Sequence, residues 1–334
     1  MHVVFLLTTP VLNMCFHPRE FPRLSEHSVA LSNESEASRL AAFWTRHAQD
    51  VEFLVTGWKT PPLTDEMLDQ APKLRAILHA AGSTRHLLPR SVWGRGIRTS
   101  SAREALAIGV AETTLGMIIA GLKGFFPAAR MTAQGGWLID NDRVMGYQIR
   151  EMYQRTIGII GLSKVAQHLI RLLGQFEVQI LATDPHVSPE KAEELGVELV
   201  PLDTLMQRSD VVTLLAPALP ETHKMLGSRQ FSLMRDGAIF INTARGMIVD
   251  EHALAEELKR GRIWAFLDVT DPEPPAADHP FRSLPNVVLT PHLAGAVGNG
   301  CLRLGRSVVD QILEFAAGNA MHGEFSAAEW TILA

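Results

Sequence analysis

Apolar runs without polar interruption recur at regular intervals along the second half of the chain. The runs occupy residues 156–161, 178–184, 210–217, 237–243, 264–269 and 286–292. A strand with one face in water alternates apolar and polar residues, whereas a strand covered on both faces is apolar throughout. The pattern therefore predicts six strands of a parallel sheet that is buried on both sides.

The stretches between these runs have the amphipathic spacing of helices. Residues 163–175 and 250–261 are the clearest examples, and the second has Asp250 placed to cap its start and Gly261 just beyond its end. Strands that alternate with crossover helices build a doubly wound α/β domain, which binds its ligands beyond the carboxyl ends of the strands. We expect such a domain over residues 104–296.

The first hundred residues repeat this rhythm on a smaller scale. Apolar runs at 2–8, 50–57, 74–82 and 97–101 are separated by helical patterns, including one at 36–48. They predict a second α/β unit. A long helix near 105–125 would lead from the first unit to the second, and a helix at 303–318 would return the chain. The expected domains are thus residues 1–103 with 297–334, and residues 104–296, with the active site in the cleft between them.

Composition narrows the function classes. The chain has 334 residues and a net charge of -5, and its 31 basic residues form no basic block, which argues against nucleic acid and anionic membranes as partners. Only Cys15 and Cys301 occur, far apart, so we expect neither disulfides nor a zinc site, and a reducing cytoplasm. Residues 105–126 approach the length of a membrane span, but Glu112 and Lys123 interrupt the run, which favours a buried helix.

The turn after the first of the six strands resembles the glycine fingerprint of dinucleotide-binding proteins. Residues 158–166 read GIIGLSKVA, so Gly161 can make the tight turn, whereas Ser163 and Ala166 stand where Gly-x-Gly-x-x-Gly has its second and third glycines. Alanine is an accepted alternative at the third position, and serine adds only a Cβ and a hydroxyl. We interpret the turn as an altered dinucleotide site.

Asp184 supports this interpretation. It follows Gly161 by 23 residues and ends the next predicted strand, where a carboxylate can accept a hydrogen bond from a ribose 2′-hydroxyl and repel a 2′-phosphate. NAD is therefore expected rather than NADP. The alternative is that Asp184 merely forms an Asp-Pro turn. Its spacing from Gly161 favours the first interpretation without excluding the second.

Three further side chains follow the last three predicted strands. Arg245, Glu273 and His292 would lie at one edge of a parallel sheet, and such a group suits the oxidation of a hydroxy acid. An imidazole can remove the hydroxyl proton, a carboxylate can orient the imidazole, and a guanidinium can bind the substrate carboxylate. Each residue alone has a structural alternative: a surface ion pair for Arg245, a solvated loop for Glu273, and a loop histidine for His292.

The chain resembles the D-2-hydroxyacid dehydrogenase family, whose members are NAD-dependent. The segments that carry the resemblance are residues 236–269, Glu273 with its two prolines, and residues 284–295. The resemblance extends from about residue 74 to 300. It implies a Rossmann-type NAD domain and a smaller flavodoxin-like substrate domain. It also implies that His292 is the general acid and base, that Glu273 orients it, and that Arg245 binds the substrate carboxylate.

The resemblance carries further residue roles. The backbone amides of Ala81, Gly82 and Ser83 correspond to the loop that binds the substrate carboxylate, and Asp268 to the residue that contacts the nicotinamide carboxamide. The full set expected to contact the cofactor is Gly161, Ser163, Lys164, Val165, Asp184, Pro217, Thr222, Thr243, Ala244, Asp268 and His292. A homodimer is also implied, built around the long helix and residues 135–149.

Departures from the family pattern leave alternatives open. Ser163 and Ser83 replace glycines, and Arg85 replaces an aspartate. An NAD(H)-sensing protein of the corepressor type and a phosphite dehydrogenase on the same scaffold therefore remain as alternatives, whereas Glu273 argues against a formate dehydrogenase. The identity of the 2-hydroxy or 2-keto acid, and the direction of the reaction in the cell, stay open.

Overall fold

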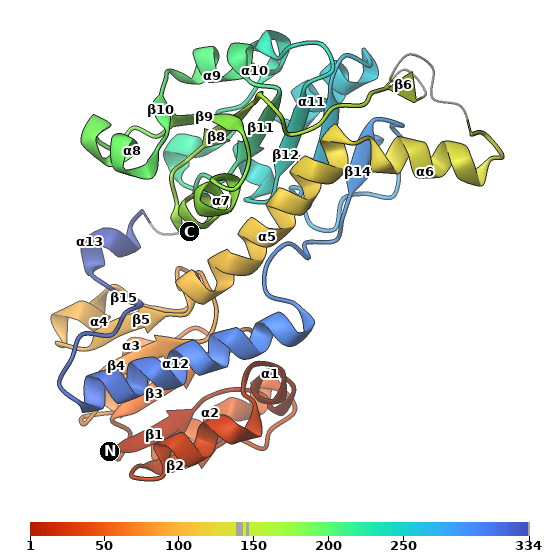
Figure 1. Ribbon diagram of the computed structural model, residues 1–334. Helices are drawn as coiled ribbons and strands as arrows, with labels where there is room; N and C mark the ends of the chain where they lie inside the picture. The colour runs from red at the N-terminus through yellow and green to blue at the C-terminus, as the bar shows by residue number, and fades with distance from the viewer. Residues whose placement is uncertain (138–142, 145–146, 333–334) are drawn as a thin grey trace. The chain divides into compact units, whose positions relative to one another are not determined.

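The computed structural model describes residues 1–137, 143–144 and 147–332 and divides into two compact units (Figure 1). One unit comprises Met1–Gly109 with Ala296–Ala334, and the other comprises Val110–Gly295. The sequence placed the first boundary at 103/104 and the second at 296/297. The helices expected near 105–125 and at 303–318 had indicated that the chain leaves the first unit and later returns to it.

The Val110–Gly295 unit holds a seven-stranded parallel sheet in the order β10-β9-β8-β11-β12-β13-β14. All six predicted strands are present, and the seventh, β10, was missed because two residues are too few to form an apolar run. The chain order reverses between β8 and β11, as in doubly wound dinucleotide-binding domains. The strands are β8 (Arg155–Ile160), β9 (Val178–Thr183), β10 (Glu198–Leu199), β11 (Val211–Leu214), β12 (Ile239–Asn242), β13 (Trp264–Leu267) and β14 (Val287–Leu289).

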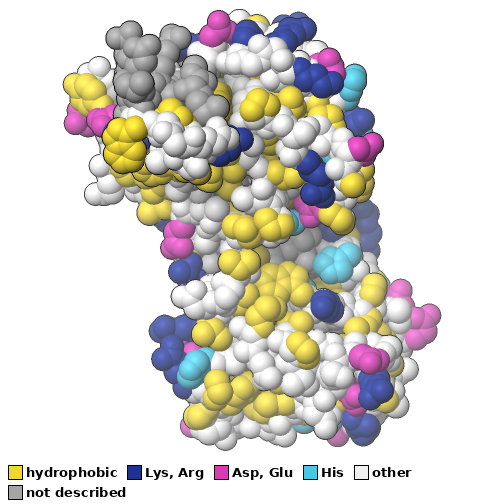
Figure 2. Space-filling model, turned by 90° about the vertical axis from the view of Figure 1, so that its right-hand side faces the viewer, with side chains coloured by type: hydrophobic (Ala, Val, Ile, Leu, Met, Phe, Trp, Pro, Cys, Tyr) yellow, Lys and Arg dark blue, Asp and Glu magenta, His cyan; other side chains and the backbone are white. Residues whose placement is uncertain are grey.

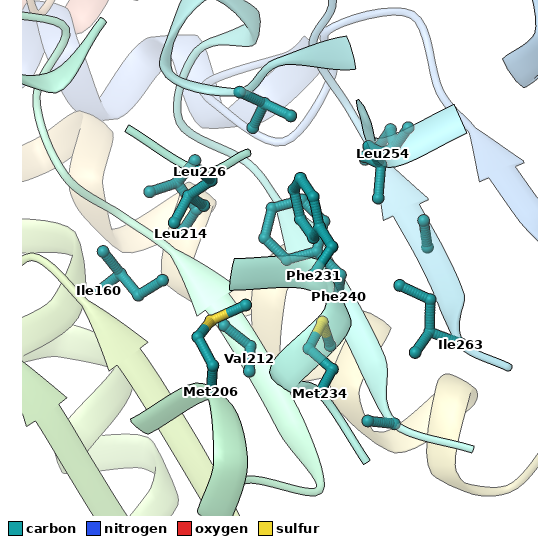
Figure 3. Packing of buried hydrophobic residues seen from close by; sticks show 14 of the residues in the cluster. Ile160, Met206, Val212, Leu214, Leu226, Phe231, Met234, Phe240, Leu254 and Ile263 are labelled. Atoms are coloured by element: carbon teal, nitrogen blue, oxygen red, sulfur yellow. The ribbon is translucent and has the colours of Figure 1, made fainter. Parts of the chain in front are cut away.

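Burial on both faces of this sheet explains its unbroken apolar runs. Val212, Leu214 and Phe240 belong to one buried cluster, part of which Figure 3 shows around Phe231 and Met206. Their strand neighbours, among them Val211 and Ile241, belong to a second cluster, because successive side chains of a strand point to opposite faces. The helices are α7 (Lys164–Leu173), α8 (Pro189–Leu195), α9 (Leu202–Arg208), α10 (Ser228–Leu233) and α11 (Glu251–Lys259).

The predicted ends of α11 are confirmed. The side chain of Asp250 accepts a hydrogen bond from the backbone N–H of Ala253 at 3.1 Å, which satisfies one of the free amides at the helix start. Gly261 lies just beyond the end with a φ of +72°, a conformation that favours glycine. Short 3-10 turns, η3 (Pro220–Thr222), η4 (Gly246–Ile248) and η5 (Pro280–Arg282), follow three of the strands.

The other unit contains a six-stranded sheet in the order β15-β5-β4-β3-β1-β2. Its parallel strands have the flavodoxin order, as predicted, and β15 joins β5 in the antiparallel sense. The half-exposed β2 and the two-residue β15 were missed, since neither has an apolar run. The strands are β1 (His2–Phe5), β2 (Ser28–Leu31), β3 (Phe53–Thr56), β4 (Ala76–His79), β5 (Arg98–Ser101) and β15 (Glu324–Phe325).

Helices of this unit come from both ends of the chain. The C-terminal helix α12 packs against α1, so the last part of the sequence completes the core of the first. The helices are α1 (Thr9–Cys15), α2 (Leu40–His47), α3 (Asp65–Asp69), α4 (Ser91–Gly94), α12 (Cys301–Ala316) and α13 (Ala327–Trp330), with 3-10 turns η1 (Pro18–Leu24), η2 (Ala37–Arg39) and η6 (Gly298–Gly300).

The long apolar helix α5 (Arg103–Leu122) contains the boundary between the units. Of the helices that the structure describes, it is the one with the length and apolarity of a membrane span, properties that the buried core helices of other proteins share. Only 44% of its most apolar window is buried, so the prediction of a buried helix holds for one face. Gly124, with a φ of +64°, separates α5 from α6 (Phe125–Ala133).

Candidate active site

The glycine turn between β8 and α7 depends on one residue that must be glycine. Gly161 has a φ of +89°, and a Cβ built there would lie 2.5 Å from the Cα of Ala216 at the end of β11. Ser163 ends the turn as the N-cap of α7, and its hydroxyl accepts the backbone N–H of Ala166 at 3.4 Å. The departure from glycine at this position therefore supplies a helix cap, and the helix N-terminus stays available to a pyrophosphate.

Asp184 is tied to the same turn. Its Oδ2 accepts the backbone N–H of Leu162 at 2.7 Å, and its Oδ1 accepts that of His186 at 2.9 Å. The turn-forming alternative is therefore present in the structure. Each carboxylate oxygen still has a second lone pair, so the carboxylate can also accept a ribose hydroxyl, and that role stays a prediction.

The loop after β11 lies at the neighbouring strand end and contains two of the expected cofactor residues. The hydroxyl of Thr222 donates to the carbonyl of Pro217 at 2.7 Å and accepts the N–H of Leu219 at 2.8 Å. Both bonds close this loop on itself. Lys164 and Val165 form the first turn of α7. These positions suit the predicted cofactor contacts, which stay predictions.

The turn after β12 is shaped by Asn242. Its side-chain oxygen accepts the N–H of Ala244 at 3.0 Å, and its amide donates to the carbonyl of Arg245 at 3.1 Å. Thr243 is buried, and its hydroxyl lies 2.9 Å from that of Thr114 on α5. The turn that presents Arg245 is thus held from within and by α5.

The loop that carries Arg245 approaches the loop that carries Glu273 because of the next residue in the chain. A Cβ on Gly246 would lie 2.1 Å from the carbonyl carbon of Thr270, so only glycine allows the loops after β12 and β13 to approach this closely. Burial lowers the pKa of the Arg245 guanidinium, and the nearby carboxylate of Glu273 opposes this shift. The guanidinium donates one hydrogen bond, at 2.6 Å, to the carbonyl of Ala244. The predicted cation and carboxylate therefore share one edge of the sheet.

Asp268 fixes the loop that follows β14. It is 1% exposed, and its carboxylate accepts the hydroxyl of Thr290 at 2.6 Å and the N–H groups of Leu293 and Ala294 at 2.9 and 2.8 Å. These three donors flank His292, which has a φ of +52°. The sequence did not predict this anchoring role. The contact of Asp268 with a nicotinamide carboxamide stays a prediction.

His292 and Glu273 form the pair that the sequence predicted. The Nδ1 of His292 lies 2.7 Å from Oε2 of Glu273, and Oε1 of Glu273 accepts the N–H of Thr270 at 3.3 Å. The imidazole is 46% exposed, and its Nε2 has no hydrogen bond to any residue within the ranges that the structure describes. Nε2 is therefore the nitrogen available to a reacting molecule.

Ala81, Gly82 and Ser83 follow β4 in the unit formed by Met1–Gly109 and Ala296–Ala334. Their backbone N–H groups donate to no described residue, although the carbonyl of Ala81 accepts the N–H of Ala102 at 3.1 Å. Three successive free amides suit the binding of an anion. This observation supports the predicted nest without testing it.

Arg85 has a structural partner in the same unit. Its guanidinium donates to the carbonyl of Thr331, so it holds the C-terminal segment. Burial, with a smaller effect of His86, lowers the pKa of His79 to about 3. The neutral His79 lies 3.0 Å, by its Nδ1, from the hydroxyl of Thr56. His79 therefore serves the core beneath the loop.

Two threonines on α5 are functional candidates that the sequence analysis missed. Thr114 contacts Thr243, and the hydroxyl of Thr113 donates to the carbonyl of Ala294 at 3.2 Å. The helix thereby holds the loops that carry Arg245 and His292. The signal was available, since two polar residues interrupt an apolar helical run, but the sequence alone did not show what they contact.

Comparison with known proteins places this arrangement in a family. Residues 115–294, more than half of the chain, match the model of the NAD-binding domain of D-isomer-specific 2-hydroxyacid dehydrogenases. The chain belongs to this family. The Val110–Gly295 unit contains the family's NAD-binding domain, so NAD is the cofactor, as the sequence predicted. Gly161 and the N-terminus of α7 fit its pyrophosphate.

Individual relatives agree with the family. The chain is 36% identical over 254 residues to a D-3-phosphoglycerate dehydrogenase of Archaeoglobus fulgidus, a match that covers 76% of this chain and 47% of that one. A glyoxylate reductase of Korarchaeum cryptofilum is 32% identical, with 91% and 92% covered. The chain thus spans about half the length of the first of these relatives.

A solved structure shares the fold over nearly the whole chain. A phosphoglycerate oxidoreductase from Rhizobium etli has a TM-score of 0.83 and 27% identity, and the match covers 97% of this chain and 98% of that one. The two-domain architecture expected from the sequence is therefore that of the dehydrogenases this chain resembles.

Proposed function

We propose that this family member is an NAD-dependent oxidoreductase that interconverts a D-2-hydroxy acid and the corresponding 2-keto acid. The observation that carries the proposal is the 2.7 Å contact between His292 and Glu273, with the second imidazole nitrogen free and Arg245 nearby. A structural histidine has no need of a buried aspartate, a carboxylate partner and an exposed nitrogen together. A general acid and base needs this arrangement.

The residues have defined tasks in the reduction of a keto acid. Bound NADH supplies the hydride to the carbonyl carbon. The protonated Nε2 of His292 donates a proton to the carbonyl oxygen, and the carboxylate of Glu273 stabilises the imidazolium beforehand. Arg245 binds the substrate carboxylate through parallel hydrogen bonds and polarises the carbonyl. In the oxidation direction, neutral His292 accepts the hydroxyl proton.

The amides of Ala81, Gly82 and Ser83 are proposed as further donors to the substrate carboxylate, because they are free of described partners. The names of the relatives indicate two reactions to try first. These are the reduction of glyoxylate and the oxidation of 3-phosphoglycerate. Loss of NADH absorbance with a panel of 2-keto acids is the direct test. Consumption of NADH with at least one acid is expected, whereas NADH binding without turnover would favour the NAD(H)-sensing alternative.

Replacing Asp184 is expected to weaken the preference for NAD. Asp184→Asn removes the charge that repels a 2′-phosphate but keeps one oxygen for the Leu162 amide. A hydrogen bond to a charged group contributes about 1.5–3 kcal/mol, so the ratio of kcat/KM for NADH over NADPH should fall about ten- to a hundred-fold. Kinetics with both cofactors measure this ratio. If it does not change, the ribose is recognised by other residues.

A homodimer is proposed on the family resemblance and on exposed aromatic residues near α6. Phe125, Phe126 and Trp137 are 57%, 41% and 85% exposed, and Figure 2 shows exposed hydrophobic side chains on this side of the Val110–Gly295 unit. Part of the predicted interface, residues 138–142 and 145–146, lies outside the described residues. Light scattering should give twice the 36.8 kDa chain mass. A monomer at micromolar concentration would contradict the proposal.

The cytoplasmic location that the sequence suggested is carried forward as a proposal. It rests on Cys15 and Cys301, which are both buried and free.

A further inference from the structure

Glu251, the first residue of α11, contacts the loop that carries Glu273. Its Oε1 accepts the backbone N–H of Asp271 at 2.9 Å, and its Oε2 lies 3.3 Å from Nε2 of His279. The side chain is only 13% exposed. Asp271 and Glu273 are two residues apart, so Glu251 holds one side of the loop while Glu273 contacts His292 from the other.

The protonation of His279 follows from its second nitrogen. Its Nδ1 accepts the backbone N–H of Phe281 at 3.3 Å, so the proton of the neutral ring is on Nε2, the nitrogen beside Glu251. Burial lowers the pKa of His279, assisted by Arg282 and opposed by Asp278. Oε1 of Glu251 thus accepts an N–H group, and Oε2 lies 3.3 Å from the nitrogen that carries the ring proton of His279, an arrangement that suits the ionised carboxylate.

The ionisation of Glu251 falls in the neutral range. Burial is the largest cause that raises its pKa to about 7, and the carboxylates of Asp271 and Glu273 add to this effect. The backbone N–H of Asp271 and the ammonium group of Lys224 oppose it. A proton gained near pH 7 converts the ionised acceptor of the Asp271 amide into a neutral acid, and a hydrogen bond to a neutral acceptor is weaker than one to a carboxylate.

We propose that Glu251 is a positioning residue which, through the Asp271 amide, holds Glu273 in place against His292. The inference rests on the proposed function, because it assigns Glu251 to the same reaction. It adds a pH dependence of the reduction rate that arises from Glu251 and not from the imidazole of His292. As the pH falls through about 7, the hydrogen bond that anchors the loop weakens and Glu273 is less firmly positioned.

Three variants test this role by the rate of keto acid reduction. Glu251→Ala removes the acceptor and should lower kcat by about ten- to a hundred-fold through misplacement of Glu273, with the KM for NADH unchanged. Glu251→Gln keeps one acceptor oxygen and should recover kcat to within about five-fold of the wild type, the cost of one hydrogen bond. Glu256→Gln, on the same helix and at a carboxylate that pairs with Lys259 at 2.7 Å, is the matched control.

The pH profile separates positioning from a merely structural role. The glutamine side chain of the Glu251→Gln variant cannot titrate, so the ratio of its rate to the wild-type rate should rise as the pH falls through the pKa of Glu251, about 7. A constant ratio, or a Glu251→Ala enzyme as fast as the Glu256→Gln control, would overturn the inference.

Hydrogen–deuterium exchange gives a readout that does not require activity. A peptide covering 268–275 contains three prolines, so the Asp271 amide is one of few that exchange. It should exchange faster in Glu251→Ala than in the wild type and Glu251→Gln. Equal exchange in all three would refute the anchoring contact. If the wild type reduced no keto acid while exchange behaved as expected, the proposed function would fail and the positioning contact would stand.

Discussion

His292→Asn is expected to lower kcat for 2-keto acid reduction by about a hundred- to ten-thousand-fold, the usual contribution of a general acid. Asparagine is chosen because residue 292 has a φ of +52°, a conformation that asparagine adopts readily and alanine does not. The variant keeps the backbone contacts with Asp268 and removes the proton donor. Single-turnover oxidation of NADH measures the loss in the chemical step, and NADH fluorescence should show unchanged cofactor binding.

The control for this variant is a second imidazole–carboxylate pair of similar exposure. His322 lies 3.0 Å, by its Nδ1, from Glu314, and the two side chains are 37% and 34% exposed. His322→Asn should leave kcat unchanged. A His292→Asn enzyme that turns over at the wild-type rate would exclude His292 as the proton donor, whatever its contact with Glu273.

Arg245→Lys is expected to lower kcat/KM for the keto acid by about a hundred- to a thousand-fold, close to the effect of removing one donor to a developing oxyanion. Lysine keeps the positive charge but cannot make two parallel hydrogen bonds to a carboxylate. Because the interaction serves both binding and the polarised carbonyl, KM should rise and kcat should fall. Steady-state kinetics over a range of keto acid concentrations separate the two effects.

Arg229→Lys is the matched control, since Arg229 is exposed in the same unit and pairs with Asp203 at 2.5 Å. It should leave both constants unchanged. The KM for NADH should also be unchanged in Arg245→Lys. If Arg245→Lys raised the KM for NADH and left the constants for the keto acid unchanged, Arg245 would belong to the cofactor site. That result would contradict its proposed contact with the substrate.

The fold could be predicted for those strands whose burial produces a continuous apolar run in the sequence. Strands such as β8 and β11 are covered on both faces, so their residues are mostly apolar and the run is visible. β10 and β15 have two residues each, and their pairing is decided by neighbouring strands rather than by their own composition. No local pattern could have revealed them.

The candidate site was predictable to the extent that strand ends in a parallel sheet meet at one edge. That rule brings Arg245, Glu273 and His292 to the same place from three separate segments. It does not say which carboxylate contacts the imidazole. Asp268 and Glu273 both follow β13, and only the family resemblance assigned the imidazole to Glu273. In the structure Asp268 binds backbone amides of the loop while Glu273 contacts the ring.

By itself the sequence determined the doubly wound sheets, the turn at Gly161 and the residue types at the strand ends, because periodicity and glycine geometry are local properties. Only the tertiary structure decided how those ends are held: Gly246 against Thr270, Asp268 beneath His292, Thr114 against Thr243, and Glu251 behind Asp271. Each of these contacts joins residues distant in the chain. They form only after the strands have paired, so no stretch of sequence contains the information alone.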